Sequence, residues 1–357
     1  QTRRRFIMVE VTASPNLMLS YAVVVLLLIV PHYVFIHHYL HCMIAGPLLV
    51  WIGCQRALIE ASKAPEDSQA EMVSKTDAMQ FPLIGSAVLF GLYVVVKFVN
   101  KEYLDVLISC YFAILGAMGV YAVVRPPLAD LGLVGSKSFE IRFHWQYWKA
   151  AEKREAFELA FTLYDVGVFA LCACASVAYA LKKTWYLNNL LGAAFSIQGI
   201  EMISLGSYVI GCLLLCGLFV YDVFWVFGTE VMVAVAKNLN APVKILFPKA
   251  VNVTPIPVSM LGLGDIVIPG IFVALMLRFD AHLKLGSTPY FASNLAAYVV
   301  GLGVTIGVMH FFDAAQPALL YLVPACIGAS LLTAAARGEV QTLLNFSVEK
   351  PKDAKED

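Results

Sequence analysis

The sequence predicts an all-α polytopic membrane protein, and three observations lead to this fold class. Hydrophobic residues make up 60% of the 357 residues and charged residues only 14%, which leaves too little polar surface for a soluble domain. Apolar runs that reach the roughly 20 residues needed to cross a bilayer recur along the chain. The net charge is zero, which excludes nucleic-acid binding by phosphate neutralisation.

The first apolar run is too long for one span. Residues 11–55 contain no Lys, Arg, Asp or Glu, and Pro31 with the histidines of 37–41 divides the run. We therefore expect one segment near 17–36 and a second near 40–56.

The segment near 17–36 has a basic flank. Arg3, Arg4 and Arg5 precede it, as in a signal peptide or a signal anchor. We expect residues 1–36 to be a cleaved signal, an extra span or an artefact of a chain fragment. Further apolar segments are expected near 81–99, 103–124, 164–181, 187–206, 208–228, 260–277, 290–312 and 316–336. The sequence thus predicts ten membrane-spanning helices, or nine without the first.

The connecting stretches differ in character. Residues 59–80 are expected to be a solvated loop, and the alternation in 139–143 predicts a short strand within the mixed stretch 125–163. Residues 229–259 contain four prolines and cannot form one continuous helix.

The distribution of Lys and Arg predicts the orientation. If the loops that follow the 40–56 segment alternate in side, one set holds 15 of these residues and the other holds seven. The richer set is expected on the cytosolic side, together with the C-terminal tail. The 229–259 loop then lies outside.

The eight cysteines all lie in apolar runs. A disulfide framework would place them in polar loops instead. Two close pairs, Cys172 with Cys174 and Cys212 with Cys216, could suggest a metal site, but packing inside lipid-embedded helices is the favoured interpretation.

Four ionisable residues stand inside predicted spans: Glu201, Asp222, Asp265 and His310. Such groups are costly in a bilayer and are functional candidates. Asp222 and Asp265 have no Lys or Arg nearby on their own segments. Glu201 is expected to form a hydrogen bond between helices, with a lining role in a polar cavity as the alternative, and His310 is expected at the interface.

The depths of the two aspartates predict that they meet. Asp222 precedes its segment end by six residues and Asp265 follows the next segment start by five. Each therefore lies roughly 8–9 Å below the same membrane face. Two adjacent carboxyls share one proton, so one can act as a general base on water and the other as a general acid toward a carbonyl. Gly262 and Gly264 leave room for a substrate backbone and loosen the helix.

Three short runs carry a family resemblance: Tyr221-Asp222, Gly262-Leu263-Gly264-Asp265 and Gln316-Pro317-Ala318-Leu319. Together they resemble the signatures of the presenilin-type intramembrane aspartyl proteases. The longer runs 221–228 and 316–328 resemble the signal peptide peptidase branch of that family rather than the presenilins.

The resemblance implies roles for these residues. Asp222 and Asp265 match the catalytic aspartates, while the remaining residues of the three runs match positions that shape the active site. It also implies nine transmembrane helices: an N-terminal six-helix bundle in 37–228, a lumenal loop in 229–259, a three-helix group in 260–336 and a cytosolic tail in 337–357.

The resemblance further implies residence in the endoplasmic reticulum membrane and no cofactor. The implied partners are transmembrane peptides, namely signal peptides and type II or tail-anchored segments, with a homo-oligomer or association with membrane-protein degradation machinery as further possibilities. The sequence lacks H-E-x-x-H and G-x-S-x-G, the motifs of zinc and serine hydrolases.

Several hypotheses stay open at this point. A proton-coupled transporter also uses intramembrane aspartates, and a non-proteolytic scaffold could bind membrane helices. Residues 243–247 could supply a strand edge for an unwound substrate. Asn252 begins a glycosylation sequon in the predicted lumenal loop, whereas the sequon at Asn345 lies in the predicted tail.

Overall fold

The computed structural model describes residues 15–63, 72–131, 140–148, 154–229, 231–232, 235, 241–250, 253, 256–284, 286–312 and 316–348. The sequon residue Asn252 lies outside these residues. The long helices are α1 (Pro15–Ile29), α2 (His38–Lys63), α3 (Lys75–Phe98), α4 (Lys101–Asp130), α5 (Leu163–Lys182), α6 (Trp185–Met202), α7 (Tyr208–Phe227), α9 (Gly264–His282), α10 (Pro289–Phe312) and α11 (Leu319–Arg337).

The short elements are η1 (Val30–His32), α12 (Val340–Leu344) and six strands. The strands pair as β1 (Met72–Val73) with β4 (Ser204–Leu205), β2 (Glu140–Trp148) with β3 (Arg154–Thr162), and β5 (Lys244–Pro248) with β6 (Val258–Gly262). The first pair is parallel and the other two are antiparallel. The short strand expected in 139–143 is thus the start of the longer β2.

Each of the ten predicted apolar segments overlaps a helix, and the helical membrane fold class is confirmed. Eight of the helices in the described residues are long and apolar enough to cross a membrane, so a number of nine is not confirmed. The two others are α6 and α9, which carry several polar side chains. Both pack inside the protein.

Several helix boundaries differ from the sequence expectation: α1 ends at Ile29 rather than near 36, and α3 begins at Lys75 rather than near 81. Helix α2 continues to Lys63 rather than ending near 56, so Arg56 lies inside the helix. Helix α4 continues through Pro126 and Pro127 to Asp130. Helix α9 begins at Gly264, because the residues before it form strand β6.

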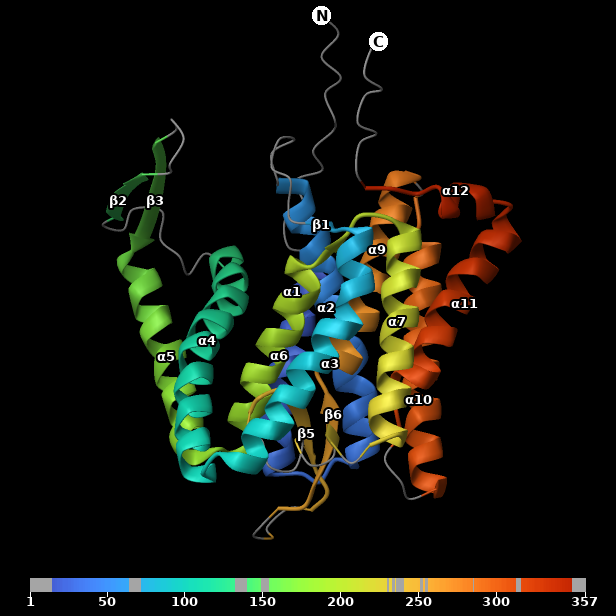
Figure 1. Cartoon of the computed structure of the whole chain (residues 1–357). Helices are drawn as coiled ribbons and strands as arrows, with labels where there is room; N and C mark the ends of the chain where they lie inside the picture. Colours follow the sequence, from blue (N-terminus) through green and yellow to red (C-terminus); the bar gives the residue numbers. More distant parts are fainter. Residues whose placement is uncertain are drawn as a thin grey trace, which may run out of the picture.

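The elements surround α9. This helix packs against α2, α6, α7, α10 and α11, and most of its side chains are buried. In Figure 1, α4 and α5 lie side by side at one flank near the β2–β3 hairpin, while the β5–β6 hairpin lies at the other end of the bundle. The expected division into a six-helix bundle and a three-helix group stays a prediction.

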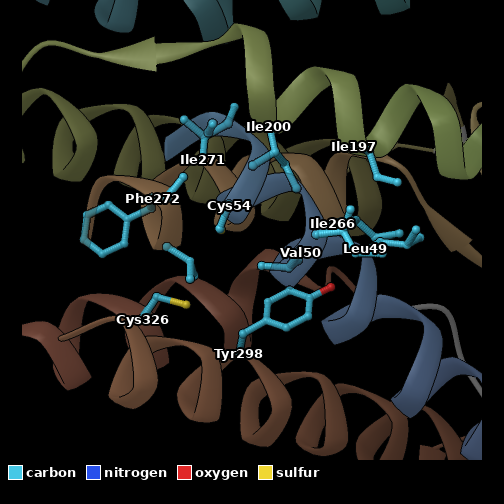
Figure 2. Packing of buried hydrophobic residues seen from close by; sticks show 14 of the residues in the cluster. Leu49, Val50, Cys54, Ile197, Ile200, Ile266, Ile271, Phe272, Tyr298 and Cys326 are labelled. Carbon is cyan, nitrogen blue, oxygen red and sulfur yellow. The ribbon is translucent and has the colours of Figure 1, made fainter. Parts of the chain in front are cut away.

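The core depends on the close approach of three helices at Ile200. A Cβ atom at Gly53 of α2 would lie 2.8 Å from the Cβ of Ile200, and one at Gly270 of α9 would lie 2.5 Å from its Cδ1. Glycine is therefore required at both positions for α6 to insert this side chain. Figure 2 shows Ile200 among the buried residues Cys54, Ile271 and Phe272.

Candidate active site

Asp222 lies on α7 and is buried, with 5% of its surface exposed. Its Oδ2 atom accepts a hydrogen bond of 3.1 Å from the backbone N–H of Leu319, the first residue of α11. The first N–H groups of a helix have no partner within the helix and carry its positive end. The start of α11 therefore stabilises negative charge on Asp222.

Asp265 lies in the first turn of α9 and is partly exposed. Its carboxyl accepts a hydrogen bond from the backbone of Gly262. A Cβ atom at position 262 would lie 3.1 Å from Oδ2 of Asp265, so a larger residue there would crowd the carboxyl. This carboxyl also lies at the positive end of a helix.

The structure brings the two carboxyls into one site. Helices α7 and α9 pack against each other, and the charge of Asp222 acts on Asp265. The described residues contain no Lys or Arg that is hydrogen-bonded to either carboxyl. The site is therefore a pair of acids held by backbone N–H groups.

The Gln316–Leu319 run leads into α11 beside this pair. Pro317, Ala318 and Leu319 are buried, and Gln316 is partly buried. The Tyr321 hydroxyl donates to Oε1 of Gln316 at 3.5 Å. Only Leu319 has a hydrogen bond to an aspartate of the pair, so this run contacts the site through its backbone.

Two other residues of the three runs, Tyr221 and Leu263, contact neighbouring helices. The ring of Tyr221 lies 3.5 Å from where a Cβ of Gly85 would stand, which places it against α3. The Leu263 side chain reaches to 3.7 Å from the corresponding position of Gly192 on α6. Gly264 is exposed and has only Ile268 nearby.

The β5–β6 hairpin leads directly into Asp265. Its register pairs Ile245 with Leu261 and Phe247 with Ser259. The hairpin extends by a hydrogen bond of 3.0 Å from the N–H of Leu263 to the carbonyl of Val243. The prediction of a strand in 243–247 is confirmed for residues 244–247.

The expected role of β5 as an open edge is wrong. Its outward-facing polar groups are already bonded to α6: Asn189 donates from Nδ2 to the Leu246 carbonyl and accepts from the Leu246 N–H, both at 2.7 Å. Asn188 donates to the Lys244 carbonyl at 2.6 Å. The open edge of the hairpin belongs to β6.

Sequence reasoning missed Asn188 and Asn189. Both are 3% exposed and lie near the start of α6. The available signal was the pair of adjacent amides in an otherwise apolar segment, since amides in a membrane helix require hydrogen-bond partners.

Other polar residues of the helices have side-chain partners. Glu201 forms an ion pair of 2.8 Å with Arg56, which confirms its expected interhelical hydrogen bonding. Nδ1 of His310 lies 3.2 Å from the Tyr39 hydroxyl at the end of α10. Asp165 caps α5 and pairs with Arg125. All eight cysteines are free thiols.

Comparisons with known proteins agree with this arrangement. The signal peptide peptidase family model matches residues 65–350. Signal peptide peptidase of Mus musculus is 41% identical over 309 residues, which cover 86% of this chain and 82% of that protein, and the Homo sapiens protein gives the same values. A probable intramembrane protease of Schizosaccharomyces pombe is 35% identical over 314 residues, covering 86% and 93%.

A solved structure shares the fold. The presenilin family intramembrane aspartate protease in the C222 space group aligns with a TM-score of 0.50 at 16% identity, covering 82% of this chain and 99% of that one. The family model spans most of the chain, and so do relatives well above 30% identity. The chain therefore belongs to the signal peptide peptidase family and is a multi-pass intramembrane aspartic endopeptidase that acts on membrane helices.

Proposed function

We propose that Asp222 and Asp265 are the catalytic carboxyls and that the substrates are signal-peptide remnants and type II or tail-anchored transmembrane segments. The observation that carries this proposal is the acid pair itself, two carboxyls from the adjacent helices α7 and α9. Asp222 faces the N-terminus of α11, and Asp265 lies in the first turn of α9. Neither carboxyl has a hydrogen-bonded cation in the described residues. The family membership supports proteolysis over the proton-coupled transporter.

The chemistry follows from one shared proton. One carboxyl is ionised and removes a proton from a water molecule, whose oxygen attacks the scissile carbonyl carbon. The other carboxyl donates its proton to the carbonyl oxygen, so the tetrahedral intermediate is neutral. Collapse of the intermediate breaks the C–N bond, and a proton passes to the leaving nitrogen. The backbone N–H groups of Leu319 and Gly262 hold the ionised forms in place.

A helical substrate must unwind before this attack, because its peptide groups are hydrogen-bonded within the helix. The unwound backbone then needs partners in an apolar surrounding. Strand β6 offers them: its residue pairing to β5 leaves the N–H and C=O of Met260 facing away from β5, and no described residue bonds to them. We propose that the substrate pairs with this edge, as in β-strand addition.

The experiment that tests the function is cleavage of a synthetic signal peptide by the purified protein in detergent. We expect cleavage within the apolar segment, and about tenfold faster cleavage when a Leu-Leu pair in that segment is replaced by Gly-Pro, since the substrate then unwinds more easily. Products are identified by mass spectrometry. A protein that cleaves no peptide of a helix-weak series would contradict the proposal and favour the scaffold hypothesis.

The β6 edge gives a sharper prediction. Met260→Pro removes the N–H that faces away from β5 and leaves the β5–β6 hydrogen bonds in place. Proline is tolerated at such a position on an edge strand. We expect kcat/KM to fall about tenfold or more, with little change in thermal stability. The matched control is Met260→Leu, which keeps the N–H and is expected to cleave within about twofold of the unmodified protein. Equal rates for the two variants would remove β6 as the substrate edge.

The setting of the site completes the proposal. We propose that the protein resides in the endoplasmic reticulum membrane with its C-terminus in the cytosol, in line with the excess of Lys and Arg on that side. Association with a second copy or with degradation machinery is proposed on the family resemblance alone.

A further inference from the structure

Helix α6 carries a side-chain clamp on strand β5. The amide of Asn189 bonds to both polar groups of Leu246, and the amide of Asn188 bonds to the carbonyl of Lys244. A primary amide presents an N–H donor and a carbonyl acceptor side by side in one plane, as the edge of a peptide strand does. Asn189 therefore occupies the place that a neighbouring strand would take.

The same face of α6 packs against the rest of strand β5. One turn after the asparagines, a Cβ at Gly192 would lie 2.8 Å from Cδ1 of Ile245, so the absence of a side chain lets the strand lie on the helix. Ile245 and Phe247 are buried on one face of β5. The ring of His41 from α2 packs edge-on against Phe247 with centroids 5.0 Å apart.

The clamp has two consequences for the strand pair. Without Asn189, the N–H and C=O of Leu246 would be unpaired in an apolar interior, a loss that would loosen β5. A slip of β5 by one residue would also turn the side chains of Ile245 and Phe247 to the opposite face of the strand, out of their buried positions. Asn189 therefore fixes both the presence and the register of the hairpin.

The register of the hairpin sets the position of the site. Strand β6 ends at Gly262, and the Leu263 N–H bonds to Val243 before α9 begins. Gly262 in turn donates to Asp265. A shift in β5 would move this connection and the carboxyl at its end.

We propose that Asn189 is a positioning residue of the protease: it closes the outer edge of β5 and holds the hairpin in one register, so that β6 alone receives the substrate and the cut falls at a defined bond. This inference rests on the proposed function. Asn189 acts through the hairpin and does not contact the carboxyl pair.

The test compares Asn189→Leu with a matched control in full-length protein. Asn294→Leu serves as the control, because Asn294 is also a fully buried amide of a membrane helix but bonds only within α10. We expect Asn189→Leu to lower kcat about tenfold or more with KM changed by less than about twofold, and to spread cleavage to neighbouring peptide bonds. The control should keep the cleavage positions, and it should lose less thermal stability than Asn189→Leu, because it leaves no backbone N–H group unpaired.

A folded Asn189→Leu protein with unchanged kcat and unchanged cut positions would overturn the inference. If that variant does not fold, Asn189→Asp takes its place, since it keeps the acceptor for the Leu246 N–H and loses the donor to the Leu246 carbonyl. This variant is expected to show a smaller fall in kcat and a smaller spread of cleavage positions. Unaltered cleavage would overturn the proposal.

A second measurement separates this inference from the proposed function. Hydrogen exchange of the Leu246 amide is expected to be slow in the unmodified protein and at least about tenfold faster in Asn189→Leu, with faster exchange at Leu261 across the hairpin. If the unmodified protein cleaves nothing, the proposed function fails while this result still supports the clamp. Exchange that is equal in both proteins overturns the clamp whatever the activity.

Discussion

Replacing either Asp222 or Asp265 by asparagine is expected to lower the rate of peptide cleavage by at least about 10³-fold. Each variant keeps the size of the side chain but cannot exchange a proton as a carboxyl does. Asparagine at position 222 can still accept the Leu319 N–H through its side-chain oxygen, so the start of α11 keeps its partner. The measurement is single-turnover cleavage of the synthetic signal peptide, with the cleaved peptide bonds identified by mass spectrometry of the products.

The loss should be non-additive. Because the two carboxyls share one proton, removing the second after the first is expected to cost less than about tenfold more. The control is Asp105→Asn, which alters a carboxyl that is paired with Lys183 outside the site and should leave cleavage within about twofold. Cleavage that survives in both single variants would mean that the acid pair is not the catalyst.

The presence of an acid pair could be predicted from sequence because it depends on local information. An aspartate without a cation in an apolar segment is anomalous at any position in the fold. Counting residues from the segment ends then sufficed to predict that Asp222 and Asp265 meet. The error of several residues at the start of α9 did not matter for this, since Asp265 stays near the same end of the bundle.

The parts that sequence could not supply depend on partners far apart in the chain. Asn189 bonds to a residue 57 positions later, and the bond exists only in one strand register. The end of strand β6 was included in the helical segment predicted for 260–277, because a short apolar run does not distinguish a strand from a helix. Arg56 was expected at the end of the 40–56 segment, and the sequence did not reveal its partner Glu201, which lies 145 residues away along the chain.

Arg56 is fully hydrogen-bonded within the bundle. Its Nε and Nη2 atoms donate to Glu201 at 2.8 and 2.9 Å, and Nη1 donates to the Tyr21 hydroxyl at 3.1 Å. Nη1 and Nη2 also donate to the carbonyls of Val123 and Ala122, both at 3.2 Å. All five N–H groups of the guanidinium are used. One side chain thus joins α1, α2, α4 and α6.

The two carbonyls need this donor because of the sequence of α4. The residues four positions after Ala122 and Val123 are Pro126 and Pro127, which have no backbone N–H. Their helical partners are therefore missing, and Arg56 replaces both. Tyr21 ties α1 into the same network, so residues 15–29 pack as an integral helix in this structure.

Replacing Arg56 by methionine is expected to destabilise the protein by about 3–5 kcal/mol, because Glu201 becomes a buried unpaired charge and two carbonyls lose their donor. This corresponds to a fall in the thermal midpoint on the order of 5–10 °C in a given detergent. Glu201→Gln should cost less, since its amide can still accept one of the Arg56 hydrogen bonds.

The double variant Arg56→Met with Glu201→Met separates charge from packing. It removes both ions, so it should be more stable than Arg56→Met alone, while still less stable than the unmodified protein because the carbonyls of α4 remain unpaired. The matched control is Arg337→Met, which breaks a partly exposed ion pair with Glu339 and should lower the thermal midpoint far less than Arg56→Met does. An Arg56→Met midpoint equal to that of Arg337→Met would show that the network contributes no more than a surface pair.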